Sequence, residues 1–77
     1  MKQVQVLGTG CPKCKKLASL VERVAQERQL DVQIEKVTDI TRIADFGAVT
    51  TPALAIDGRI VVAGKIPSED DLASHLA

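Results

Sequence analysis

The stretch Gly8-Thr9-Gly10-Cys11-Pro12-Lys13-Cys14-Lys15-Lys16, residues 8–16, contains both cysteines of this 77-residue chain. Residues 3–7 before it (QVQVL) alternate polar and apolar side chains, which is typical of a β-strand. After Pro12, apolar residues recur every three or four positions, which predicts a helix that runs to about Gln29. The two cysteines are therefore expected where a strand gives way to a helix.

The helix start determines what the two cysteines can do. We expect Cys11 at the N-cap and Pro12 at the first helical position, where a missing N–H costs nothing. Free N–H groups and the helix dipole lower the pKa of a thiol there, and Lys13 adds positive potential. Residues three apart on a helix have Cβ atoms about 5–6 Å apart, and a disulfide needs about 3.5–4.5 Å. Small adjustments close that gap, so the pattern predicts a reversible redox pair with Cys11 as nucleophile and the more buried Cys14 as resolving thiol.

Other interpretations of the cysteines remain open at this point. Two partly buried thiols without a function are the plainest, since cysteines are often simply buried. A closed zinc site needs four ligands, and the chain offers two cysteines and His75. A two-coordinate soft metal such as copper(I) needs only Cys11 and Cys14. Heavy-metal-associated domains carry a similar motif, but their element order, β-α-β-β-α-β, differs from the order predicted below.

The middle of the chain predicts a second strand and a short helix. Residues 32–37 (VQIEKV) alternate again. Thr38 or Asp39 is suited to cap a short helix that turns Ile40, Ile43 and Ala44 inward. We expect Phe46-Gly47 to end this helix, with Phe46 and Val49 in the core.

The last third predicts a hairpin and a helix. Two apolar runs, residues 53–56 and 60–63, flank Asp57-Gly58, which is the strongest short hairpin signal. Ser68 is suited to cap a final helix whose Leu72 and Leu76 point inward. The predicted order is β-α-β-α-β-β-α in a single α/β domain, residues 1–77, with a mixed four-stranded sheet and helices on both faces.

Composition narrows the class of partner. Ten basic residues balance ten acidic ones, and Phe46 is the only aromatic residue, which argues against nucleic acid or an anionic membrane as the main partner. The sequence has neither a signal-peptide pattern nor an apolar run long enough to span a membrane. We expect a cytoplasmic monomer. A permanent structural disulfide is rare in that compartment, which disfavours a purely structural role for the pair.

The stretch VTTPAL, residues 49–54, is the second signal. A proline that opens a strand is tolerated because its missing N–H falls at the end of the ladder. Thr51-Pro52 is more informative than a lone proline because it follows the CxxC motif and precedes a hairpin and a helix.

With GTGCPKCKK at 8–16, TTPALAIDG at 50–58 and VVAGKIPS at 61–68, nearly the whole chain resembles the thioredoxin superfamily. It is most similar to the small redox-active disulfide (thioredoxin/glutaredoxin-like) proteins of archaea and bacteria. The resemblance implies a cis Thr51-Pro52 bond beside the disulfide, a Thr51 backbone that hydrogen-bonds substrate, and strand order 4-3-1-2 with the third strand antiparallel. Glutaredoxins carry a paired glycine and an acid that hold glutathione, whereas Gly64 here is followed by Lys65-Ile66-Pro67.

The sequence therefore predicts a thiol–disulfide oxidoreductase. Its substrate would be a protein or small-molecule disulfide, and a reductase, not identified by the sequence, would supply electrons. No prosthetic group is required, because the Cys11–Cys14 disulfide itself carries two electrons. The alternative that we carry forward is a soft-metal or metalloid binding protein that uses the same two thiolates.

Overall fold

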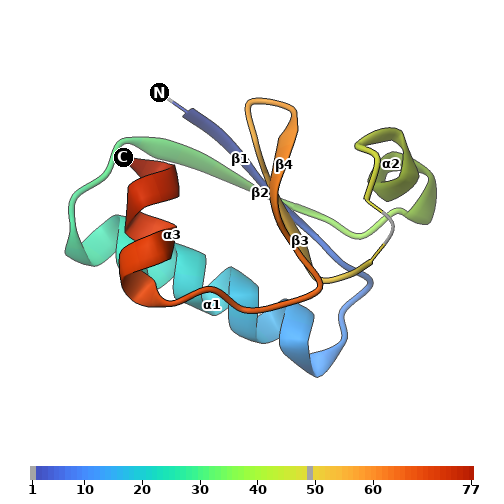
Figure 1. Cartoon of the computed structure of the whole chain (residues 1–77), viewed down its shortest axis with the longest axis horizontal. Helices are drawn as coiled ribbons and strands as arrows, with labels where there is room; N and C mark the ends of the chain where they lie inside the picture. The colour runs from blue at the N-terminus through green and yellow to red at the C-terminus, as the bar shows by residue number, and fades with distance from the viewer. Residues whose placement is uncertain (1, 49) are drawn as a thin grey trace.

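The computed structural model describes residues 2–48 and 50–77, so the prediction for Val49 lies outside the described residues. The described residues form four strands and three helices in the predicted order (Figure 1). The elements are β1 (Lys2–Leu7), α1 (Pro12–Glu27), β2 (Val32–Val37), α2 (Ile40–Asp45), β3 (Ala53–Ile56), β4 (Arg59–Ala63) and α3 (Glu69–Leu76).

The sheet has the order β2-β1-β3-β4, which is the predicted 4-3-1-2 arrangement read from its other edge. β1 pairs with β2 in parallel, and β3 is antiparallel to both of its neighbours, β1 and β4. The parallel pair is joined through α1, as a β-α-β crossover requires. Consequently the carboxyl ends of β1 and β2 and the start of β3 meet at the same end of the sheet.

The main core lies between the sheet and the helices α1 and α3, which run side by side on the same face (Figure 1). Leu17, Val21 and Val24 are fully or almost fully buried along the predicted face of α1, and Leu72 and Leu76 do the same in α3. Two ion pairs tie the helices together at their exposed surface, Arg23 with Glu69 and Arg28 with Asp70. The predicted inward positions of α3 are thus confirmed, and the buried residues of α1 recur every three or four positions as predicted.

The opposite face of the sheet carries a smaller cluster under α2. Ile43 packs there with Leu7 and Val37, and Phe46 is partly buried against them. The prediction that Ile40 and Ala44 point inward was wrong: both are exposed, Ile40 by 72%. A helix of six residues makes fewer than two turns, so it presents only one apolar side chain to the sheet.

Helix α1 ends at Glu27, two residues before the predicted end. Gln29 has φ 53°, and the N–H of Leu30 donates to the carbonyl of Ala25 at 2.9 Å. This is the hydrogen-bond pattern of a Schellman motif, in which a residue in the left-handed region follows the last helical turn. The helical spacing of side chains continues beyond Glu27, but the backbone turns toward β2 there.

Candidate active site

The loop that follows β1 delivers Cys11 to the N-cap of α1. Cys11 has φ −65° and ψ 162°, which is extended backbone, and Pro12 occupies the first helical position. The N–H of Lys15 donates to the carbonyl of Cys11 at 3.0 Å and closes the first turn. Gly10 precedes this turn with φ +95°, a left-handed conformation that glycine adopts without steric cost. The predicted placement of the first cysteine at the mouth of the helix is therefore confirmed.

Cys11 and Cys14 form a disulfide across the first turn of α1, with their Cα atoms 5.1 Å apart. This separation lies within the range of about 4.4–6.8 Å that ordinary disulfides span. The N–H of Cys14 points at the sulfur of Cys11, with a nitrogen-to-sulfur distance of 3.3 Å. An N–H directed at this sulfur, at the positive end of the helix dipole, favours the thiolate once the bond is reduced.

The two sulfurs differ in their access to solvent. Cys11 is half-buried, whereas Cys14 is only 5% exposed. The flanking Pro12 and Lys13 are exposed. A foreign disulfide can therefore approach Cys11, while Cys14 is shielded by the end of the sheet.

Gly8 is the residue that shields Cys14, a role the sequence did not reveal. A Cβ atom on Gly8 would lie 2.3 Å from the sulfur of Cys14 and 2.8 Å from its Cβ. Real atoms do not approach so closely, so only glycine leaves room for the buried sulfur. Gly8 directly follows the last residue of β1, and the turn before Cys11 is made at Gly10.

Thr51 and Pro52 lie at the same end of the sheet as the disulfide. β1 and β3 are antiparallel with Leu7 opposite Ala53, so Pro52 comes next to Gly8 when the register is continued by one residue. The Thr51-Pro52 bond is cis, as the resemblance implied. Pro52 is buried and Thr51 is exposed. The carbonyl of Pro52 accepts a hydrogen bond from Gly64 at 2.8 Å, which ties the loop after β4 to this end.

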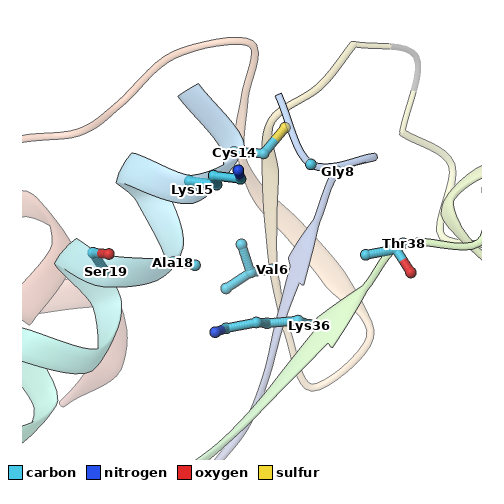
Figure 2. A pocket seen from close by; sticks show the side chains of 9 residues that line it. Val6, Gly8, Cys14, Lys15, Ala18, Ser19, Lys36 and Thr38 are labelled. Atoms are coloured by element: carbon cyan, nitrogen blue, oxygen red, sulfur yellow. The ribbon is translucent and has the colours of Figure 1, made fainter. Parts of the chain in front are cut away.

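A pocket of about 320 Å³ opens beside Cys14, between the start of α1 and the end of β2 (Figure 2). Val6, Gly8 and Ala18 form its apolar part. Lys36 of β2 and Thr38, which directly follows β2, also line it, and both were absent from the predicted site. The sequence did indicate these two positions, because the predicted parallel pairing of residues 3–7 with 32–37 brings the ends of the two strands together.

A domain of this topology, with a CxxC disulfide at the start of its first helix and a cis proline across from it, defines a thiol–disulfide oxidoreductase of the thioredoxin type. A family model described as "Thioredoxin domain" matches residues 2–77. The chain belongs to the thioredoxin family.

Individual relatives agree with this assignment. The chain is 41% identical to a thioredoxin of Methanocaldococcus jannaschii over 76 residues, which cover 99% of this chain and 87% of that protein. It is 29% identical to a thioredoxin of Methanothermobacter thermautotrophicus over the full length of both. The solution structure of reduced MJ0307 superposes with a TM-score of 0.57 over 97% of this chain and 92% of its own, at 22% identity, and supports the fold.

Two further observations concern the described residues only. Within residues 2–48 and 50–77, no group of three or more His, Cys, Asp or Glu side chains is placed to hold a metal ion. In the same part of the chain, no helix has the length and hydrophobicity needed to cross a membrane.

Proposed function

We propose that the protein reduces or exchanges disulfides of protein or small-molecule substrates through Cys11 and Cys14. The observation that carries this proposal is the position of the Cys11 sulfur. It is half-buried at the helix start and receives the N–H of Cys14 at 3.3 Å. A thiolate is the attacking species in disulfide exchange, and this position favours it.

The reaction runs in two exchanges. The Cys11 thiolate attacks one sulfur of the substrate disulfide, the substrate S–S bond breaks, and one substrate thiolate leaves. The Cys14 thiolate then attacks the Cys11 sulfur of the mixed disulfide, and the second substrate thiolate leaves as the Cys11–Cys14 bond closes. Two electrons pass from the protein dithiol to the substrate, and each released thiolate takes a proton from solvent. A reductase must then return two electrons to the protein disulfide.

The remaining site residues shape this chemistry. Thr51 is exposed next to the buried Pro52, which supports a role for its backbone in pairing with an extended substrate segment that reaches Cys11. Pro12 starts the helix that presents the sulfur, and the exposed Lys13 adds positive potential near it. The disulfide is the redox group in this proposal, and no other cofactor is invoked.

Reduction of insulin by the protein, with dithiothreitol as electron donor, tests the proposal. We expect turnover by the unchanged protein and none by Cys11→Ser. A titration of the reduced protein with copper(I) tests the alternative in parallel. Tight copper(I) binding together with inertness toward insulin and small disulfides would favour the metal-binding function and overturn the redox proposal.

A further inference from the structure

Three segments near the disulfide contain no carboxylate, and two of them carry lysines. Residues 8–21, 46–56 and 60–68 contain no Asp or Glu, although the chain has ten acidic residues in total. The same segments contain Lys13, Lys15, Lys16 and Lys65. A chain whose formal net charge is zero is thus positive at its reactive end.

Among the described residues, these lysines also have no Asp or Glu partner. Within residues 2–48 and 50–77, none of the four lysines lies within ion-pair distance of a carboxylate, whereas Arg23, Arg28, Lys36 and Arg42 each do. Two other cations in those residues also lack an Asp or Glu partner: Arg59, at the hairpin turn near the opposite end of β4, and Lys2, which donates to the backbone oxygens of His75 and Ala77. The paired cations face acids of the chain itself, and the lysines near Cys11 face solvent.

A groove of about 620 Å³ runs along this positive surface, between the outer side of α1 and the loop that leads to α3. Its apolar lining residues are Pro12, Leu20 and Ile66, and Lys15, Lys16 and Arg23 lie along it. The groove begins at Pro12, which is bonded directly to Cys11. A molecule seated at that end of the groove therefore lies one residue along the chain from Cys11.

Ile66 distinguishes this groove from an ordinary solvated face. It is 36% exposed, and among the described residues the other large hydrophobic side chain with comparable exposure is Ile40, on the far face of the sheet. An exposed apolar side chain among cations, beside a reactive site, is typical of a surface that another protein covers.

We propose that this groove receives a segment of an acidic protein partner, with an apolar side chain against Ile66 and carboxylates against the lysines. The proposal deepens the proposed function and rests on it: the surface selects acidic partners for exchange at Cys11. Four cations spread over two segments suit an extended acidic segment better than a compact anion. A second copy of this chain fits less well, because two of the acids at the start of α3, Glu69 and Asp70, already pair with Arg23 and Arg28.

Two synthetic peptides, each a disulfide loop flanked by one leucine, test the selection. One carries aspartates beside the leucine and the other carries lysines. We expect the reduced protein to reduce the acidic peptide at least about tenfold faster at low salt, since complementary charge raises association rates by about 10–1,000-fold. The difference should shrink as ionic strength rises. Equal rates for the two peptides would overturn the proposal.

Variants locate the effect on the groove. Lys16→Glu combined with Lys65→Glu should reverse the preference, and Arg59→Glu, the control at the far end of β4, should leave it unchanged. Ile66→Ser should slow the reduction of the acidic peptide several-fold, but it should not slow the reduction of an acidic peptide with glycine in place of leucine. A preference that survives the double charge reversal, or that changes equally with Arg59→Glu, would contradict the proposed surface.

Two readouts separate this proposal from the proposed function. A small uncharged disulfide should be reduced equally by all these variants, and failure of every variant to reduce it would count against the function itself. An acidic peptide with serines in place of cysteines can bind but cannot react. NMR signals of Leu20 and Ile66 during its titration therefore report on the groove without any redox step. Absence of shifts there, or sedimentation showing that the groove joins two copies of the chain, would overturn the partner assignment.

Discussion

The sulfur of Cys14 lies against the backbone of Gly8, so close that a methyl group on Gly8 would be 2.3 Å from it. The contact joins the end of β1 to the first turn of α1. It also places Cys14 one strand away from Pro52, through the register of β1 with β3. The size of one residue in the loop therefore sets the space in which the second sulfur can move.

Gly8→Ala should destabilise the reduced protein by about 1–3 kcal/mol, the usual cost of overpacking. Urea denaturation of the reduced proteins measures this. The matched control is the same substitution in a Cys14→Ala background, where the sulfur is absent and only the contact with the Cβ atom remains. The cost should be smaller there, and an equal cost in both backgrounds would mean that the sulfur is not the obstacle.

Cys14→Ser should leave a stable mixed disulfide between Cys11 and a substrate. The reason is that the serine hydroxyl does not resolve the first exchange, while Cys11, half-buried at the helix start, still attacks. Mass spectrometry after incubation with a disulfide-bonded peptide detects the adduct. Cys11→Ser is the control, and its remaining thiol is only 5% exposed. If Cys11→Ser trapped the peptide and Cys14→Ser did not, the two roles would have to be exchanged.

Pro52→Ala should slow insulin reduction by about one to two orders of magnitude, the scale expected when a reacting group is misplaced by about 1 Å. Pro52 is buried beside Gly8 and holds the loop after β4 through its carbonyl. Steady-state kinetics with insulin, compared with a small uncharged disulfide, separate substrate docking from chemistry. An insulin rate equal to that of the unchanged protein would show that Pro52 does not contribute to substrate docking.

The fold was predictable because most of its local signals agree with one another. Alternation marks β1 and β2, Asp57-Gly58 marks the hairpin, and Ser68 caps α3 with its hydroxyl accepting the N–H of Asp71 at 3.2 Å. The end of α1 escaped prediction because apolar periodicity does not show where the backbone enters the left-handed region, as it does at Gln29. Ile40 was misplaced because periodicity gives the face of a helix but not what lies beneath it.

The site was predictable where its residues are adjacent in sequence. Cys11, Pro12 and Cys14 are positioned by a single helix start, and Thr51-Pro52 was predicted through the family resemblance. Whether Gly8, Lys36 and Thr38 belong to the site depends on how the ends of the strands meet in space. A contact between a loop glycine and a sulfur six residues later has no local pattern, so it becomes visible only in the folded chain.

Leu72→Ala and Ile40→Ala should have very different effects on stability. Leu72 is fully buried between α3 and the sheet, so its truncation should cost about 2–5 kcal/mol. Ile40 is 72% exposed, and its truncation should change the free energy of unfolding by no more than about 0.5 kcal/mol. Urea denaturation of both variants checks this. Similar losses from the two substitutions would mean that Ile40 is packed in solution.

The ion pair between α2 and β2 gives a pH-dependent prediction. Arg42 donates to both oxygens of Glu35, at 3.0 and 3.3 Å, and these hydrogen bonds lower the pKa of that carboxyl. A carboxyl whose pKa is lower in the folded state stabilises the fold above its unfolded pKa, and the contribution disappears as the pH falls through the folded pKa. Arg42→Ala should therefore raise the pKa of Glu35 and destabilise the protein slightly near pH 7, with the stability difference vanishing once the pH is below the folded pKa of Glu35.

Side-chain carbon NMR of Glu35 across the acidic range, in the unchanged protein and in Arg42→Ala, measures this shift directly. Because both partners are exposed, the change in stability should be small, and the titration is the sharper test. Glu22→Gln is the matched control, since Glu22 pairs with Lys36 on the other face of β2 and does not contact Arg42. It should leave the Glu35 titration unchanged. If Glu35 titrated at the same pH with and without the arginine, the hydrogen bonds would not be formed in solution, and α2 would be held to the sheet by Ile43 and its apolar neighbours alone.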